Sequence, residues 1–493
     1  MKKFLIALVS IILVVAIGAG VVLFIGNRYV AGISHDDIPA TAEVKKNELG
    51  TITAVGRGLY GQDGKRFEIK GINYGNLFIA EGWMTVNSMG AAYNEDGSFV
   101  RVNDQGIVEE YEEIYQEEMD AVLAERFTLS EIEELNEVFF DAYCTEADFK
   151  LIADTGLNTI RLPVYYRTFL TTSDRYTLTD EQLCQMNFED IELVFDKVDL
   201  FMEYAKKYDL KVILDMHGVM GGQSGYEHCG TRDIDFWNTE EYIVFMCNLW
   251  RAIAKHYATD RSDLAPTILA YDLANEPVSR NELSTGELQW QVMDRMYEAI
   301  REVDTDHVVS IEGVWYPNSL PAPEKYGWEN VLYQYHFYNW NHDKGVSNEL
   351  FYSLMFALYT QSNYNVPKFI GEFNFFADDA SWSKYLARYD ELGWGWTIWS
   401  YKIVSVGWWD SSWGLAVNKL NIQNDKDTPI EDYKLKLDLR TASFEEIKAV
   451  WSAEYTQYDG QEGAYGVYSD GKLYNVLKTY FGDKCVIDAE EIK

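Results

Sequence analysis

The chain has 493 residues, of which 47% are hydrophobic and 15% aromatic, and its formal net charge is −37 at pH 7. This length suffices for one large domain or two ordinary ones, and the charge makes nucleic acid an unexpected partner because phosphate binding needs clustered Lys and Arg. The five cysteines are scattered without a CxxC pair, which excludes a disulfide framework and indicates no metal cluster.

The first predicted element is a membrane-spanning helix at residues 4–26, an uncharged apolar run of sufficient length to cross a bilayer. Lys2 and Lys3 precede it, so the positive-inside rule places residues 1–3 in the cytoplasm. We expect an uncleaved single-pass anchor in the cell membrane. The alternative is secretion after signal-peptide cleavage, although a signal peptide normally has a shorter apolar region. Residues 27–50 are polar and mixed in charge, and we expect them to form a stalk.

Residues 51–493 contain no long linker and no repeat, which favours one extracellular domain. Apolar runs predict strands at residues 67–74, 157–163, 211–217, 267–275, 307–312, 331–338, 368–373 and 394–399. Helical patterns lie between most of them, at residues 145–154, 188–208, 240–257, 287–303, 349–362 and 379–392. Eight strands alternating with helices predict an α/β fold, the (β/α)₈ TIM barrel, whose chemistry lies at the carboxyl ends of the strands.

Long loop insertions are expected on that face of the barrel. Residues 78–144 separate the first strand from its helix, and an acidic stretch within them, ending in Glu117, Glu118 and Asp120, predicts an amphipathic helix with a solvated acidic face. Residues 219–235 and 400–442 follow the third and eighth strands. Loops in these positions commonly shape access to the substrate.

Polar or aromatic residues with a possible role in binding occupy the predicted carboxyl ends of seven strands. Each has a structural alternative, because an isolated buried histidine is usually a satisfied core residue, and the arginine, tyrosine and tryptophan could serve packing. That alternative weakens because all of them gather where a barrel places its active site. The candidates are Arg161, His217, Asn275, Glu276, His336, Tyr338, Glu372 and Trp399, with Glu312 as a lower-ranked third carboxylate.

Glu276 and Glu372 each close an apolar strand, and a carboxylate there is costly to desolvate unless it is paired or used. Two carboxylates facing one pocket suit glycoside hydrolysis, in which one protonates the leaving oxygen and the other attacks the sugar carbon. Retention predicts carboxyl groups about 5–5.5 Å apart, and inversion a wider separation.

The other candidates have expected roles around this pair. The general acid, Glu276, must begin the cycle protonated. Arg161 is expected to lower the pKa of Glu372, and Tyr338 to donate a hydrogen bond to that carboxylate. Asn275 is expected to bind the sugar 2-hydroxyl, and Trp399 to form the floor of the sugar site.

Six motifs in order carry a family resemblance: residues 158–163 (NTIRLP), 214–218 (LDMHG), 275–277 (NEP), 336–338 (HFY), 370–373 (IGEF) and 396–399 (WTIW). The chain resembles glycoside hydrolase family 5, of the clan of retaining β-glycosidases. The resemblance implies that Glu276 is the acid/base and Glu372 the nucleophile. It also implies that the other candidates, with Glu312 left aside, surround the substrate. Residues 217–225, 123–127 and 145–149 are similar to the exo-β-1,3-glucanase branch.

The expected function is therefore hydrolysis of β-glucosidic bonds in β-glucan-type carbohydrates, by double displacement and without a cofactor or metal. Three alternatives stay open at this point: a glycosylceramidase-like enzyme acting on glycolipids, a β-mannanase, and an inactive carbohydrate-binding protein of the cell surface. The expected partners are the carbohydrate substrate and, through residues 4–26, the membrane. The sequence leaves linkage, endo or exo action and oligomeric state undetermined.

Overall fold

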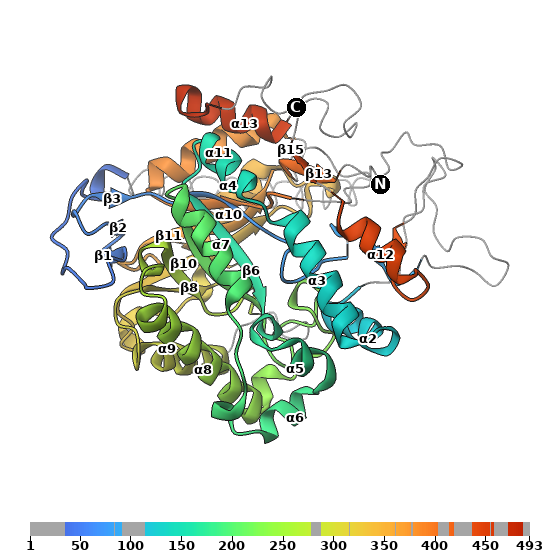
Figure 1. The fold of residues 1–493 in the computed structure, drawn as a ribbon. Helices are drawn as coiled ribbons and strands as arrows, with labels where there is room; N and C mark the ends of the chain where they lie inside the picture. Colours follow the sequence, from blue (N-terminus) through green and yellow to red (C-terminus); the bar gives the residue numbers. More distant parts are fainter. Residues whose placement is uncertain are drawn as a thin grey trace, which may run out of the picture.

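The structure is a computed structural model that describes residues 35–82, 84–90, 114–277, 287–314, 316–359, 361–375, 378–402, 414–418, 436–453, 455–457 and 472–486. Eight strands within this part of the chain close into a parallel barrel in sequence order (Figure 1). They are β4 (Lys70–Asn73), β6 (Thr159–Tyr165), β7 (Lys211–Gly218), β8 (Ile268–Asp272), β9 (Val308–Glu312), β10 (Val331–Tyr338), β11 (Lys368–Asn374) and β12 (Gly395–Ile398). This confirms the TIM-barrel α/β fold.

Helices cover the outside of the barrel. Each presents an apolar face to the strands; in α8, for example, the buried residues recur at helical spacing and include Ile243, Met246, Trp250 and Ile253. The flanking helices are α4 (Glu146–Asp154), α7 (Asp196–Lys207), α8 (Glu240–Lys255), α9 (Glu287–Arg301), α10 (Asn348–Tyr359), α11 (Asp379–Leu392) and α13 (Lys472–Phe481). Between β9 and β10 the described residues form 3₁₀ turns, η8 (Pro317–Ser319) and η9 (Pro323–Lys325).

Two predicted elements were wrong in their extent. The strand expected at residues 67–74 is divided, because Arg66–Phe67 (β3) pairs antiparallel with β2 while Lys70–Asn73 enters the barrel between β12 and β6. The helix expected at 188–208 begins only at Asp196. Phe188–Asp190 forms a 3₁₀ turn instead, after which Leu193 bridges to Leu170 and the Val194 N–H donates to the Phe169 carbonyl, 2.9 Å away.

A small antiparallel sheet of β1 (Thr53–Val55), β2 (Gly58–Tyr60) and β3 covers the amino-terminal end of the barrel. Leu59 of this sheet packs in one apolar cluster with Ile213, Leu269 and Phe369 from the barrel strands. Residues 35–50, the later part of the expected stalk, lie against the same end, where the Tyr60 hydroxyl donates to the Pro39 carbonyl at 2.8 Å.

The expected membrane-spanning segment, residues 4–26, lies outside the described residues. Within the described ranges, no helix combines the length and the apolar character needed to cross a bilayer.

The inserted segments form a second group of elements, on the side of the barrel opposite the β1–β3 sheet (Figure 1). They are α2 (Gln116–Arg126), α3 (Leu129–Tyr143), α5 (Thr172–Thr177), α6 (Asp180–Gln185), α12 (Phe444–Trp451) and the short strand pairs β5 (Asn87–Ser88) with β14 (Leu437–Asp438) and β13 (Ala416–Asn418) with β15 (Tyr455–Gln457). Helix α3 begins at a capping box in which Thr128 and Glu131 bond each other's backbone N–H groups.

The acidic helix expected in the first insert exists as α2, but its face is not fully solvated. Residues 109–113 of the predicted stretch lie outside the described residues. Asp120 is only 5% exposed, and the Arg175 guanidinium of α5 donates to both of its oxygens, at 2.8 and 3.0 Å. The buried ion pair joins α2 to α5, which explains why this carboxylate faces inward.

Candidate active site

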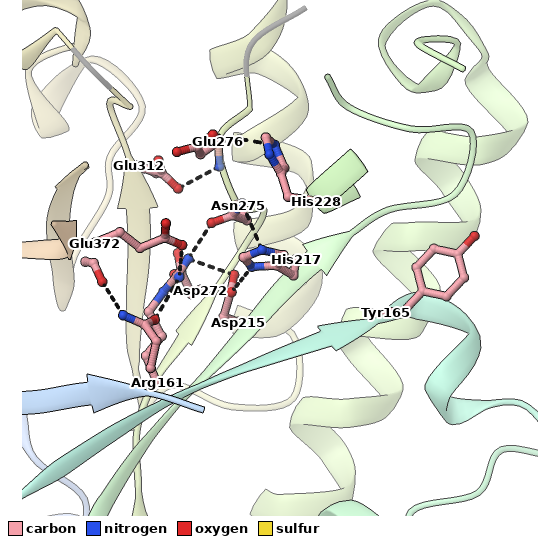
Figure 2. Close-up of polar contacts among 12 residues, drawn as sticks. Arg161, Tyr165, Asp215, His217, His228, Asp272, Asn275, Glu276, Glu312 and Glu372 are labelled. Atoms are coloured by element: carbon pink, nitrogen blue, oxygen red, sulfur yellow. Dashed lines mark hydrogen bonds and ion pairs between the residues drawn. The ribbon is translucent and has the colours of Figure 1, made fainter. Parts of the chain in front are cut away.

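The structure brings all eight predicted site residues together at the carboxyl ends of the barrel strands. Figure 2 shows Arg161, His217, Asn275, Glu276 and Glu372 among them. Parallel strands that close into a barrel end on the same side, so residues far apart in sequence converge there. Arg161 lies on β6, His217 on β7, His336 and Tyr338 on β10, and Glu372 on β11; Asn275 and Glu276 follow β8, and Trp399 follows β12.

Glu372 is held by bonds to both carboxylate oxygens. Arg161 donates to its Oε1 at 2.7 Å, and the Tyr338 hydroxyl donates to its Oε2 at 3.1 Å. Arg161 is completely buried and also donates to Asn275 Oδ1 at 2.8 Å. Gly371 leaves room for this arrangement, because a Cβ at that position would overlap the side-chain oxygen of Gln334.

Glu276 is oriented by its backbone and by two histidines. Its φ of 38° is unusual for a residue other than glycine, and its N–H donates to Glu312 Oε2 at 2.8 Å. His336 Nδ1 lies 2.9 Å from Glu276 Oε1, and His228 Nε2 lies 3.5 Å from Oε2. The side chain is 11% exposed, so solvent still reaches this carboxylate.

The separation of the two glutamates is the decisive distance. One carboxylate oxygen of Glu276, one carboxylate oxygen of Glu372 and one imidazole nitrogen of His336 all lie within 4.8 Å of one another. A retaining glycosidase needs carboxyl groups about 5–5.5 Å apart, whereas an inverting one needs about 6.5–9.5 Å. The same three side chains have the imidazole and carboxylate donors that zinc or another transition metal accepts, although double displacement requires no ion.

One guanidinium serves several buried carboxyl groups. Arg161 lies 3.0 Å from both Asp215 and Asp272, in addition to Glu372. Burial lowers the pKa of Arg161, but these charges outweigh it and leave that pKa above its usual value. Burial also raises the pKa of Asp215 to about 7 and that of Asp272 to about 6, because one cation cannot compensate every carboxylate in a dry cluster.

The expectation that Arg161 would keep the pKa of Glu372 low was only partly right. Burial raises that pKa to about 7, while His336 and Arg161 oppose the increase. Burial lowers the pKa of His336 to about 3, so this imidazole is neutral at physiological pH.

His217 and Trp399 form one wall of the site. Burial lowers the pKa of His217 well below its usual value. Its Nδ1 lies 2.6 Å from Asp215 Oδ2, and its Nε2 faces the Asn275 amide nitrogen at 3.4 Å. The Trp399 ring stacks on the imidazole, with centroids 5.6 Å apart and planes at 13°. A Cβ at Gly75 would lie 3.1 Å from the Trp399 ring, so glycine leaves the ring its place.

The chain matches the model of the cellulase family, glycosyl hydrolase family 5, over residues 122–405, more than half of its length. It belongs to glycosyl hydrolase family 5. It is 28% identical over 280 residues to glucan 1,3-beta-glucosidase 2 of Wickerhamomyces anomalus, a match that covers 55% of this chain and 56% of that protein. It is 29% identical over 197 residues to endoglucanase 3 of Fibrobacter succinogenes, covering 39% and 27%.

The chain therefore spans less than two thirds of either relative. Among solved structures it is similar to rutinosidase from Aspergillus niger, with a TM-score of 0.46 and 15% identity over 69% of this chain and 90% of that one. The match to family 5 confirms the resemblance first noted in the six ordered motifs.

Sequence reasoning missed several members of this family-5 site. Asp215 could have been found, because it lies two residues before His217 on the same strand face. Asp272 and Gln334 also lie inside barrel strands, where Gln334 donates to Asp272 Oδ2 at 2.9 Å. His228 comes from the loop after β7, and no periodic signal pointed to it. Glu312, ranked below the pair, contacts Glu276 directly through the backbone.

Proposed function

We propose that this protein hydrolyses β-glucosidic bonds in β-glucan-type polysaccharides or oligosaccharides, with retention of anomeric configuration. The observation that carries the proposal is that a carboxylate oxygen of Glu276 lies within 4.8 Å of one of Glu372. Each glutamate is held by its own set of partners. Relatives named as a glucan 1,3-beta-glucosidase and an endoglucanase support glucan as the substrate class.

In the first step Glu372 attacks the anomeric carbon while Glu276 protonates the glycosidic oxygen, so the bond to the leaving sugar breaks and a glycosyl-enzyme ester forms. In the second step the Glu276 carboxylate takes a proton from water. The resulting nucleophile attacks the same carbon and releases Glu372. Two inversions at one carbon give net retention.

The supporting residues have roles that follow from their contacts. Arg161 and Tyr338 hold Glu372 by two charge-assisted bonds, so that its attacking oxygen is oriented before substrate arrives. Neutral His336 contacts Glu276 at 2.9 Å and lies 3.6 Å from Glu372, between the two carboxyl groups. We assign Asn275 to binding the sugar 2-hydroxyl and His217 to orienting the Asn275 amide. Trp399 is assigned to packing against the face of the sugar ring.

The test is hydrolysis by the protein and by Glu276→Gln and Glu372→Gln, with exposed Glu324→Gln as the matched control. Substrates are β-1,3-glucan, β-1,4-glucan, mannan and glucosylceramide, with products sized and their anomers followed by NMR. Each site variant should fold normally and lose turnover, and the control should retain it. Release from mannan or glucosylceramide alone would replace the substrate assignment, an inverted product would overturn the mechanism, and binding without release would overturn the enzymatic proposal.

We also propose that residues 4–26 anchor the protein in the cell membrane with the catalytic domain outside. The uncharged run and the preceding lysines support this. Because residues 35–50 lie along the barrel, the spacer outside the membrane is shorter than residues 27–50. Membrane fractionation with protease accessibility tests the orientation, and an amino terminus cleaved beyond residue 20 in the mature protein would replace anchoring with secretion.

A further inference from the structure

His228 comes from the loop after β7 and meets Glu276 on its solvent side (Figure 2). It lies in the 3₁₀ turn η4 (Glu227–Cys229), which ends at Gly230 with a φ of 83°, a conformation that glycine adopts without strain. The His228 side chain is 17% exposed, and its Nε2 lies 3.5 Å from Glu276 Oε2. This histidine therefore stands at the boundary between solvent and the carboxyl group assigned as the general acid.

The imidazole of His228 is held in place by residues of its own loop and by the barrel. Buried Ser224 places its Oγ 3.2 Å from His228 Nε2, and the Tyr226 N–H donates to the same Oγ at 3.3 Å. The Tyr226 ring stacks on the imidazole, with centroids 5.7 Å apart and planes at 28°. The His217 ring meets it edge-on, with centroids 6.0 Å apart. Nε2 is thereby kept between Ser224 and Glu276.

The contacts of His336 indicate which oxygen of Glu276 carries the acid proton. His336 Nδ1 lies 2.9 Å from Glu276 Oε1, 3.5 Å from Glu312 and 3.6 Å from Glu372. A lone pair on Nδ1 would face three carboxyl groups, so the single N–H of this neutral imidazole is placed on Nδ1 and donates to Oε1. The proton that Glu276 gives to the leaving group then belongs on Oε2, the oxygen that His228 faces.

We propose that His228, supported by Ser224, is a positioning residue that holds Glu276 Oε2 in place for both proton transfers of the reaction, an assignment that rests on the function proposed above. In the first step the Oε2–H bond breaks and the proton moves to the glycosidic oxygen, which leaves the anomeric carbon as Glu372 bonds to it. In the second step Oε2 takes a proton from water, and the water oxygen displaces Glu372. Nε2 suits both states, because an imidazole nitrogen accepts from a carboxyl O–H or, when protonated, donates to a carboxylate.

Steady-state kinetics on two substrates that share a glucosyl group and differ in leaving group test this role. Dinitrophenolate leaves without protonation, whereas the sugar released from a glucan oligosaccharide needs the general acid. His228→Phe keeps a ring to stack on Tyr226 and removes Nε2, His228→Gln keeps a polar side chain, and Ser224→Ala removes the hydroxyl beside Nε2. His342→Phe is the matched control, because His342 is exposed in η10 (His342–Lys344).

His228→Phe should lower kcat/KM for the oligosaccharide about 10- to 100-fold, the effect of displacing a reacting group by about 1 Å, and change kcat/KM for the dinitrophenyl glucoside less than about twofold. On the dinitrophenyl substrate kcat and KM should fall together, because the glycosyl-enzyme accumulates when the general base is misplaced. Azide attacks the anomeric carbon without a general base and should restore kcat. His228→Gln should recover part of the oligosaccharide activity, Ser224→Ala should show the same pattern more weakly, and His342→Phe should leave both substrates unaffected.

Equal losses on the two substrates would show damage to the fold or to sugar binding and would overturn the positioning role, as would unchanged kinetics of His228→Phe. If His228→Phe folds poorly by circular dichroism, Ser224→Ala decides, and an unchanged ratio between the two substrates overturns the assignment. These outcomes leave the catalytic proposal intact. Failure of the unmodified protein to hydrolyse either substrate would instead overturn the catalytic proposal and the role of His228 together.

Discussion

Replacing Glu312 with alanine is expected to misplace Glu276 and slow catalysis. Glu312 is 1% exposed, and its Oε2 accepts both the Glu276 N–H at 2.8 Å and the Gln334 amide at 3.1 Å. Burial raises the pKa of this carboxyl well above its usual value, and the charges of Asp272 and Glu276 add to the effect. Burial therefore favours the neutral form of Glu312, in which it still accepts both hydrogen bonds.

The magnitude follows from the two donors that Glu312→Ala leaves unpaired. Each buried, unsatisfied donor costs about 1–3 kcal/mol, so the free energy of unfolding should fall by about 2–6 kcal/mol. Glu276 would also lose the bond that holds its backbone at a φ of 38°. A displacement of about 1 Å at a reacting group costs roughly 100-fold in rate. Glu312→Gln keeps a neutral oxygen acceptor of the same length and should retain most activity.

The assay is urea unfolding and steady-state kinetics of both variants between pH 5 and pH 8. Because the folded-state pKa of Glu312 is raised, unfolding releases a proton from this residue once the pH exceeds about 4.5. Its contribution to stability is therefore lost as pH rises toward the folded pKa. Glu312→Gln has no such loss, so its stability relative to the unmodified protein should increase with pH. Full activity of Glu312→Ala, or equal damage by Gln and Ala, would refute a neutral positioning role.

Three further results are expected. The value of kcat/KM should fall as the pH drops below about 7, because Glu372 must be ionised to attack and burial raises its pKa to about 7; an acid limb centred below pH 5 would contradict this. Tyr338→Phe should lower kcat at least about tenfold by removing a bond to a charged oxygen and move the acid limb to higher pH, whereas Tyr335→Phe, on the opposite face of the same strand beside Phe337, should do neither. Zn²⁺ should inhibit hydrolysis and EDTA should restore it, because Glu276, His336 and Glu372 place three ligand atoms within 4.8 Å of one another. Unchanged rates in excess Zn²⁺ would show that these atoms do not bind an ion.

Local sequence patterns were sufficient to predict the barrel strands and the polar side chains at their carboxyl ends. Apolar runs of strand length alternating with helical patterns predicted the eight barrel strands, since each element must bury a face of its own periodicity. The two-residue period placed His336 and Tyr338 on one strand face, and both contact a glutamate of the site. Where the pattern failed, at residues 67–74 and 188–195, hydrogen bonds to distant segments decided the backbone conformation.

The sequence alone determined which residues end the strands, because strand periodicity and strand ends are local properties of the chain. Only the tertiary structure decided how their charges are shared. Asp215, Asp272 and Glu372 all compete for Arg161, and burial sets each pKa through neighbours that are 54 to 211 positions away in the chain. Dielectric environment and cavity shape are sums over contacts between distant segments, and no local window of sequence contains them.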